Sequence, residues 1–271
     1  MFEESIFKAA AWHGRRLENE LIIDAHIHVG PYFNFYMPAP TADDLLVLAD
    51  RLGVRMMIAS GMAVNVDVVL ANEQTISAHR KYPDRFLPYI NVSATYPEEI
   101  GAILDMAEKE KFCHFKFHRM GPALPYDHHE YNRVYEYANS KQGCILLHTW
   151  GKNDLEAISK AAKKFRNVNF LLAHAGLVDP EAYVEIAKKN QNTFLELAGS
   201  PIKYNLVEYF VKMVGAERVI YGSDAPFINM NQQIGQVLFS RISDEDKRLI
   251  LGLNAQRLFG ESIVAEVTNK G

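Results

Sequence analysis

The sequence predicts an α/β protein that folds as one (β/α)8 TIM barrel, distorted and with an extra N-terminal helix. Apolar, β-branched runs recur at fairly even intervals, and segments with helical spacing alternate with them. Near-continuous apolar strands alternating with helices are typical of a parallel sheet covered on both faces, and eight such units suggest closure into a barrel. The length of 271 residues also suits one such barrel, which typically has about 250 residues.

The predicted elements follow from these patterns in order along the chain. Strands are predicted over residues 21–25, 54–59, 86–91, 112–117, 144–148, 168–173, 193–197 and 218–221. Helices are predicted between them, over residues 42–51, 68–81, 97–110, 130–141, 154–165, 180–189 and 206–214. The first twenty residues resemble an amphipathic helix, and a last helix is expected over residues 247–259.

Local signals mark several helix ends. Thr41 and Asp44 can form a variant of the capping box before one helix, as can Ser243 and Asp246 before the last. Gly260 stands where the last helix needs a C-cap. Because no proline-rich or serine-rich linker, low-complexity tract or strong repeat divides the chain, we expect one domain over residues 1–271.

Composition narrows the classes of partner. A net charge of −4 leaves no basic surplus to neutralise phosphates, which argues against general nucleic-acid binding. No apolar run reaches about 18 residues, so no membrane span is expected, and the N-terminus does not resemble a signal peptide. Cys113 and Cys144 lie in apolar stretches and are expected to be buried and reduced. These features predict a cytoplasmic protein with a small-molecule partner and leave a homo-oligomer open.

Histidines gather at the ends of the predicted strands. His26 and His28 end the first strand, His148 the fifth and His174 the sixth, and Asp224 follows the eighth. Active sites of such barrels lie at the carboxyl ends of the strands. Residues two apart on a strand point to the same face, so His26 and His28 converge if that face is inward. We therefore expect these side chains to meet at the mouth of the barrel.

Imidazoles and a carboxylate are suitable ligands for Zn²⁺ and similar divalent ions. A lone strand-end histidine is more often a structural residue, and His-x-His alone is weak evidence. Their coincidence on several strands together with an acid favours a metal centre. His118, two residues after Lys116, could face the same mouth. The other histidines are expected at the surface or in structural roles: His13, His79, His114, His128 and His129.

The motif set resembles the amidohydrolase superfamily. The shared motifs are D-x-H-x-H at residues 24–28, the histidines ending strands five and six, and G-S-D at residues 222–224. The closer similarity is to its amidohydrolase-2, or aminocarboxymuconate-semialdehyde-decarboxylase-like, group, with which YPDRFLPYINV at 82–92 and GLNAQRLFG at 252–260 agree. This resemblance spans nearly the whole chain and implies a distorted (β/α)8 barrel with a catalytic divalent metal, commonly Zn²⁺.

The resemblance also implies roles for individual residues. It gives a metal set of His26, His28, His148 and Asp224. His174 then either binds a second metal or acts as an acid or base beside a single ion. Many two-metal members bridge their ions with a carboxylated lysine or a glutamate on the fourth strand, where Lys116 stands, but contact with a substrate is an equally good role for this lysine. We favour one tightly held ion and leave two open.

Three functions are compatible with this reading. The first is a hydrolase of a small amide, lactone or ester bond, in which the ion lowers the pKa of water from 15.7 towards about 7. Asp224 would take the proton and His174 would stabilise the oxyanion or shuttle a proton. The second is a nonoxidative decarboxylase of a small carboxylic acid, and the third a non-catalytic metal-binding protein. A decarboxylase would gain from an arginine facing the metal. Only Arg55 and Arg119 are candidates, and Arg55 lies at the wrong end of its strand, so we rank the hydrolase first.

Substrate contacts are expected from the loops at the mouth. The connection over residues 30–40 is rich in aromatic residues and includes Tyr32. Trp150 follows the fifth strand on the same face as its terminal histidine if the strand continues. Lys116 and Arg119 are the nearest candidates to hold a substrate carboxylate.

Overall fold

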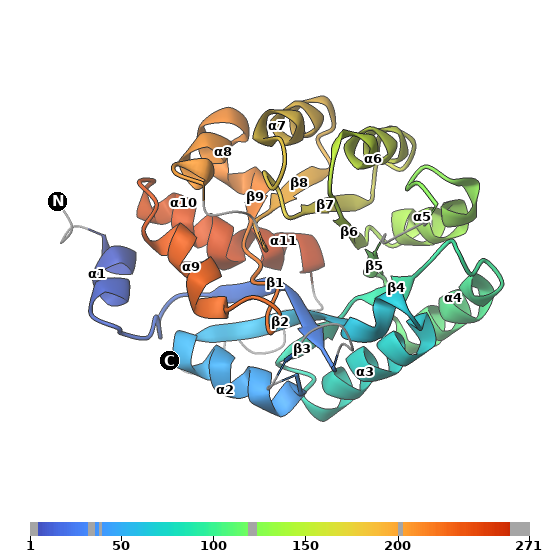
Figure 1. Ribbon diagram of the computed structural model, residues 1–271, viewed down its shortest axis with the longest axis horizontal. Helices are drawn as coiled ribbons and strands as arrows, with labels where there is room; N and C mark the ends of the chain where they lie inside the picture. Colours follow the sequence, from blue (N-terminus) through green and yellow to red (C-terminus); the bar gives the residue numbers. More distant parts are fainter. Residues whose placement is uncertain (1–4, 32–35, 38–39, 119–123, 200–202, 261–271) are drawn as a thin grey trace.

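The computed structural model, shown in Figure 1, describes residues 5–31, 36–37, 40–118, 124–199 and 203–260. Parallel strands occupy the inside, and helices are arranged around them (Figure 1). Two predicted substrate contacts, Tyr32 and Arg119, lie outside the described residues.

The strands appear close to where the sequence predicts them. They are β1 Ile22–Val29, β2 Val54–Gly61, β3 Phe86–Pro88, β4 Ile90–Val92, β5 Phe115–Phe117, β6 Cys144–His148, β7 Asn169–Ala173, β8 Thr193–Glu196 and β9 Val219–Ile220. All neighbouring pairs are parallel and form two sheets, ordered β1-β2-β3 and β4-β5-β6-β7-β8-β9. Both sheets are made of strands in sequence order, as in the predicted (β/α)8 fold.

The first seam between the sheets divides the predicted strand 86–91 at Tyr89. The backbone N–H of Tyr89 donates to Ala59 O at 2.8 Å, whereas that of Ile90 donates to His114 O at 2.8 Å. One side of the break is thus bonded towards β2 and the other towards β5. The Tyr89 hydroxyl also donates to Ala25 O on β1 at 2.9 Å, which adds a side-chain bond across the inside.

The second seam lies between β1 and the segment after β9. Ala25 N donates to Tyr221 O at 3.1 Å, and His28 N donates to Ala225 O at 2.7 Å. An isolated parallel bridge also pairs Ile27 with Ala225. Backbone hydrogen bonds therefore link the two sheets at both seams, and the interruptions of the ladder are the distortion of the barrel.

The helices are α1 Ile6–Trp12, α2 Ala42–Leu52, α3 Val68–Lys81, α4 Glu99–Glu110, α5 Asn132–Ser140, α6 Lys152–Lys164, α7 Pro180–Lys189, α8 Leu206–Val214, α9 Met230–Leu238, α10 Asp244–Arg248 and α11 Asn254–Phe259. The seven helices predicted between strands agree within two residues at each end. Helix α1 is shorter than the predicted N-terminal helix, and α9 was not predicted. The last predicted helix starts earlier, at α10, and a π-helical turn, Leu249–Leu253, separates α10 from α11.

The predicted caps are present. Thr41 Oγ1 accepts from Asp44 N at 3.2 Å, and the Asp44 carboxylate accepts from Thr41 N at 3.4 Å, which completes the capping box of α2. Ser243 Oγ accepts from Asp246 N at 3.1 Å at the start of α10. Gly260, with a φ of 59°, ends α11.

The strands separate two layers of core. Inside lies a cluster that includes Ile23, Tyr89, Leu171 and Phe259, and the larger cluster fills the space between strands and helices. Of the cysteines, Cys144 is buried as predicted, whereas Cys113 is only partly buried. Among the described residues no helix is both long and apolar enough to cross a membrane.

Candidate metal centre

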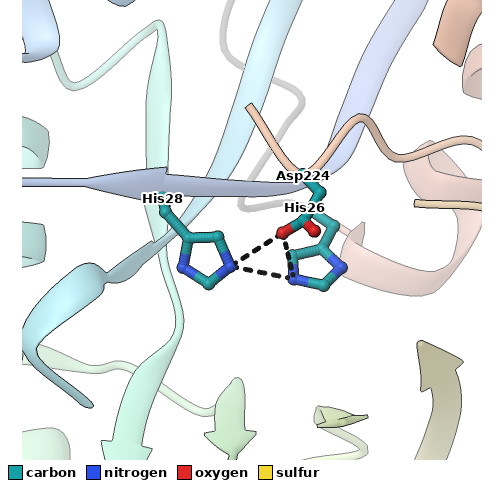
Figure 2. Close-up of side chains that lie close together, drawn as sticks. All are labelled: His26, His28 and Asp224. Carbon is teal, nitrogen blue, oxygen red and sulfur yellow. Dashed lines mark hydrogen bonds and ion pairs between the residues drawn. The ribbon is translucent and has the colours of Figure 1, made fainter. Parts of the chain in front are cut away.

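Three predicted ligands meet at the carboxyl end of β1. His26 and His28 lie two residues apart on β1, and Asp224 follows β9. Figure 2 shows the three side chains pointing toward one another. The distance is 3.2 Å between the Nε2 atoms of the two histidines. Asp224 Oδ1 lies 3.1 Å from His28 Nε2 and 3.7 Å from His26 Nε2. We call His26, His28 and Asp224 the ligand trio.

The spacing of the ligand trio fits a divalent ion. Donors at about 2.1 Å in tetrahedral geometry lie about 3.4 Å apart, which falls within the range of the three distances above. All three residues are buried, so little water can reach the imidazole nitrogens and the carboxylate oxygen that face one another. Two imidazole nitrogens and one carboxylate oxygen suit Zn²⁺ or Mn²⁺.

Asp24 holds the two segments that carry the trio. Its Oδ1 accepts from His26 N at 3.2 Å and from Ser223 N at 2.9 Å. Asp224 N also donates to His26 O at 2.8 Å. Burial raises the pKa of Asp24 to about 7. Asp24 therefore supports the ligands through their backbone.

The pKa of Asp224 is shifted in the opposite direction from that of Asp24. Burial opposes ionisation of Asp224, but the hydrogen bond from His28 and the nearby His174 and Lys116 outweigh it, so its pKa is lowered. An ionised carboxylate is what a metal ligand or a general base requires.

His148 and His174 form a hydrogen-bonded histidine pair beside the trio. His174 Nδ1 lies 2.7 Å from Ala198 O, and His174 Nε2 lies 2.9 Å from His148 Nδ1. A carbonyl only accepts, so His174 carries its proton on Nδ1. Burial lowers the pKa of His174 to about 4, which keeps the ring neutral at pH 7. His148 Nδ1 must then donate, and the lone pair falls on its Nε2.

The lone pair on His148 Nε2 accepts no hydrogen bond from any residue that the structure describes and is free to bind a metal ion. This nitrogen is buried and has no hydrogen bond among the described residues. Its ring is neutral, because burial lowers the pKa of His148 well below its usual value. His148 is not among the three residues whose donor atoms already cluster. Its predicted role as a ligand thus has suitable chemistry and stays a prediction.

Two further predicted residues lie at this end of the barrel. Lys116 on β5 is fully buried, with Nζ 3.0 Å from His26 Nε2. Burial lowers its pKa to about 8, against the opposing effect of Asp224 and Glu196. Trp150 is 56% exposed, and its ring centroid lies 5.2 Å from that of His148. Lys116 therefore adjoins the trio, and Trp150 stands over the histidine pair.

Sequence reasoning missed Glu196 and underrated His118. Glu196 ends β8 with no exposed surface, and its Oε2 lies 3.0 Å from His26 Nδ1. A lone acid at the end of the apolar run TFLEL was a signal that could have identified it. His118 stacks on His148 with ring centroids 4.1 Å apart. Its position two residues after Lys116 already indicated this face.

Backbone conformation marks two of these residues. Asp224 has a φ of 62° and His174 a φ of 60°, both in the left-handed region that favours glycine. Such a conformation costs an L-residue about 1–2 kcal/mol and clusters at functional sites. His174 directly follows β7, and Asp224 lies four residues after the end of β9.

Comparisons with known proteins indicate the family and the fold of this chain. A family model described as amidohydrolase matches residues 23–260. A putative amidohydrolase from Staphylococcus aureus superposes with a TM-score of 0.70 and 14% identity, covering 89% of this chain and 99% of that one. A 2,6-dihydroxybenzoate decarboxylase from Rhizobium has a TM-score of 0.70 and 18% identity, covering 89% and 98%. No curated protein matches the chain.

A third solved structure adds a metal. The 5-carboxyvanillate decarboxylase from Novosphingobium aromaticivorans, described in complex with manganese, has a TM-score of 0.70 and 12% identity, covering 90% of this chain and 97% of that one. At these identities the structural likeness establishes the fold, and it confirms the predicted TIM barrel. Because the family model covers most of its length, this chain belongs to the amidohydrolase family.

Proposed function

We propose that this protein is a metal-dependent enzyme that decarboxylates a small carboxylic acid without a redox cofactor. The observation that carries the proposal is the buried amine of Lys116, 3.0 Å from His26 Nε2 in the ligand trio. A buried amine beside a metal centre provides a counter-charge for a substrate carboxylate. Similar folds described as decarboxylases of aromatic acids support this choice over the hydrolase ranked first from sequence.

The ligand trio would hold the ion, with His148 Nε2 as the proposed fourth donor. When bound, a divalent ion supplies a Lewis acid that polarises an oxygen atom of the substrate. The described residues favour one ion, since Lys116 occupies the space next to His26 as an amine. Zn²⁺ and Mn²⁺ are both compatible with two imidazoles and a carboxylate.

The remaining residues of the site would position the substrate and cover it. Lys116 would pair with the carboxylate that is lost, and the exposed ring of Trp150 would cover the apolar part of the substrate. In the reaction the bond between carbon and the carboxylate breaks, CO₂ leaves, and a proton replaces it on that carbon. His174, hydrogen-bonded to His148 and close to the trio, can pass a proton along this chain.

Hydrolysis is the second candidate, favoured by the ionised state of Asp224. A carboxylate with a lowered pKa is suited to take a proton from an attacking water. In that case Asp224 would act as the base in the hydrolysis of a small ester, lactone or amide. His174, whose one N–H donates to Ala198 O, would hold His148 in place.

One screen separates the two activities. Protein loaded with Mn²⁺ or Zn²⁺ is incubated with hydroxybenzoates and with aryl esters and lactones, while CO₂ and released acid are followed separately. Release of CO₂ from an aromatic acid supports the decarboxylase. Acid release from esters or lactones without CO₂ supports the hydrolase. Loaded protein that turns over neither group overturns both assignments.

We also propose that the protein acts in the cytoplasm, as one domain over residues 1–271, on a small molecule. The net charge of −4 and the buried position of the ligand trio support a small-molecule rather than a nucleic-acid partner. Size-exclusion chromatography coupled to light scattering would determine whether a homo-oligomer forms.

A further inference from the structure

Glu196 contacts His26 of the ligand trio and Ala198, the residue whose carbonyl binds His174. Its Oε2 lies 3.0 Å from His26 Nδ1, and its Oε1 accepts from Ala198 N at 2.6 Å. Both oxygens thus face donors, and the side chain has no exposed surface. A carboxylate can accept at both oxygens at once.

The bond to His26 determines which of its nitrogens can bind a metal. The ammonium of Lys116 can only donate, so its 3.0 Å contact leaves the lone pair on His26 Nε2 and the proton on Nδ1. Glu196 Oε2 then accepts from His26 Nδ1, although burial raises the pKa of this carboxyl above its usual range. Nε2 is the atom that faces His28 Nε2 at 3.2 Å and Asp224 Oδ1 at 3.7 Å. Glu196 therefore sets the tautomer that the trio needs.

The bond to Ala198 reaches the histidine pair. The peptide N–H of Ala198 donates to Glu196, and the carbonyl of the same residue accepts from His174 Nδ1 at 2.7 Å. The neutral His174 then accepts on Nε2 from His148 Nδ1, 2.9 Å away. One carboxylate thus orients a ligand of the trio directly and His174 through one residue.

The surrounding backbone leaves this carboxylate little room to move. A Cβ added at Gly222, the glycine of the G-S-D motif, would lie 2.0 Å from Glu196 Oε1 and 2.8 Å from His26 Cβ. Gly222 is absent from the residues with positive φ, so space, not conformation, requires glycine here. The backbone just after β9, the strand paired with β8, thereby packs Glu196 against His26.

We infer that Glu196 is the positioning residue of this centre: it holds His26 in the Nδ1–H tautomer and, through Ala198, aligns His174. The inference rests on the proposed metal centre. It assigns a role to β8, which contributes neither a residue of the ligand trio nor one of the histidine pair.

Glutamine at position 196 should not be able to make the hydrogen bonds of Glu196. A carboxamide offers one acceptor oxygen, so it can satisfy Ala198 N or His26 Nδ1 but not both. If its oxygen stays with Ala198, its NH₂ faces His26 Nδ1, and the imidazole must move its proton to Nε2. The nitrogen aimed at the metal then has no lone pair.

Glu196→Gln is therefore compared with wild type for metal binding, by titration of Zn²⁺ against a chromophoric chelator. We expect affinity to fall about 10- to 100-fold. The matched control is Thr193→Val, which removes a buried hydrogen bond of 2.8 Å to Asn190 O at the other end of the same strand. The control should lose stability without losing affinity. Equal affinities of Glu196→Gln and wild type, or equal losses in both variants, would overturn the inference.

A second measurement needs no variant. Nitrogen-15 NMR of the wild-type imidazoles, before and after Zn²⁺ is added, should show His26 protonated on Nδ1 in both states. Protonation of His26 on Nε2 before metal addition would contradict the assigned role even if Glu196→Gln did not fold. Wild-type protein that binds no divalent ion but shows the Nδ1–H tautomer would refute the metal centre and leave the role of Glu196 intact.

Discussion

At the scale of the residue, the site combines side chains that sequence pattern could identify with others that it could not. His26, His28 and Asp224 stand at strand ends, where residue type alone predicted a role, and they lie together as expected. Glu196 also ends a strand, but a single acid without a motif carries little weight. Its importance comes from the 3.0 Å contact with His26, which only the folded chain displays.

Replacing the carboxylate of Asp224 should abolish activity without unfolding the protein. In Asp224→Asn the left-handed φ of 62° suits asparagine, which tolerates this conformation better than most residues. The loss of an ionised group should lower turnover by about 10²- to 10⁴-fold. Turnover and a thermal melt are measured together, with Asp67→Asn, a conservative change of the N-cap of α3, as the control. Near wild-type turnover would remove Asp224 from the proposed mechanism.

At the scale of the element, the strands and the interstrand helices lie close to where the local sequence pattern predicts them. The break in one strand and the helix α9 depend instead on packing. The strand predicted over 86–91 breaks at Tyr89, because its two ends bond to different neighbours. Helix α9 lies in a segment whose apolar residues were not recognised as a helical stripe, although Met230, Ile234 and Val237 are buried. Such contacts come from elements distant in sequence, so a local window does not contain them.

Two glycines should respond in opposite ways to alanine. A Cβ at Gly143, just before β6, would lie 1.9 Å from Cys113 O. Gly143→Ala must therefore displace backbone, and we expect it to lower the free energy of unfolding by about 3 kcal/mol or more. Gly235, inside α9, has nothing within 4 Å of an added Cβ. Gly235→Ala should stabilise by about 0.5–1 kcal/mol. Denaturant unfolding tests both, and a tolerated Gly143→Ala would show that β5 and β6 approach less closely.

His114, which lies between the strands and the last helix, should make the free energy of unfolding depend on pH. Its Nδ1 accepts from Cys144 N at 3.0 Å, and its ring packs on Phe259. Burial lowers its pKa from 6.5 to about 4. Between these values the unfolded chain binds a proton that the folded chain does not, so stability is complete above pH 6.5 and falls as pH drops towards 4.

The expected loss from this histidine is about 3 kcal/mol across the window. Denaturant unfolding of wild type and His114→Asn is compared at several pH values, since asparagine can still accept from Cys144 N. The difference between the two proteins should shrink as the pH is lowered. A constant difference would mean that His114 titrates normally in the fold.

At the scale of the whole molecule, the barrel brings together residues that are far apart in the chain. Asp24 Oδ1 accepts from Ser223 N, 199 residues away, so the first strand and the segment that follows the last strand are joined directly at the candidate metal centre. The trio thus straddles the second seam. Metal binding should therefore stabilise the whole barrel and not one loop.

Removal of metal should lower the melting temperature. At a free metal concentration of 100 Kd, binding adds about 2.7 kcal/mol to the free energy of unfolding, which corresponds to about 5–10 °C. Differential scanning fluorimetry with Zn²⁺ or Mn²⁺ and then with a chelator measures this shift. Asp224→Asn, which lacks one ligand, should show a much smaller one. A melting temperature indifferent to metal in the wild type would argue against the trio as a binding site.

The sequence by itself predicted most of the strands, the interstrand helices and three residues that the fold brings together at the candidate metal centre. Apolar periodicity and the position of a residue at the carboxyl end of a strand can both be read locally. Only the tertiary structure decided that His26 presents Nε2, that Glu196 fixes this tautomer and that Lys116 lies 3.0 Å from the same nitrogen. These facts depend on side chains of β1, β5 and β8 meeting inside one barrel. Hydrogen-bond direction at such a meeting point is fixed by packing, which no stretch of sequence contains.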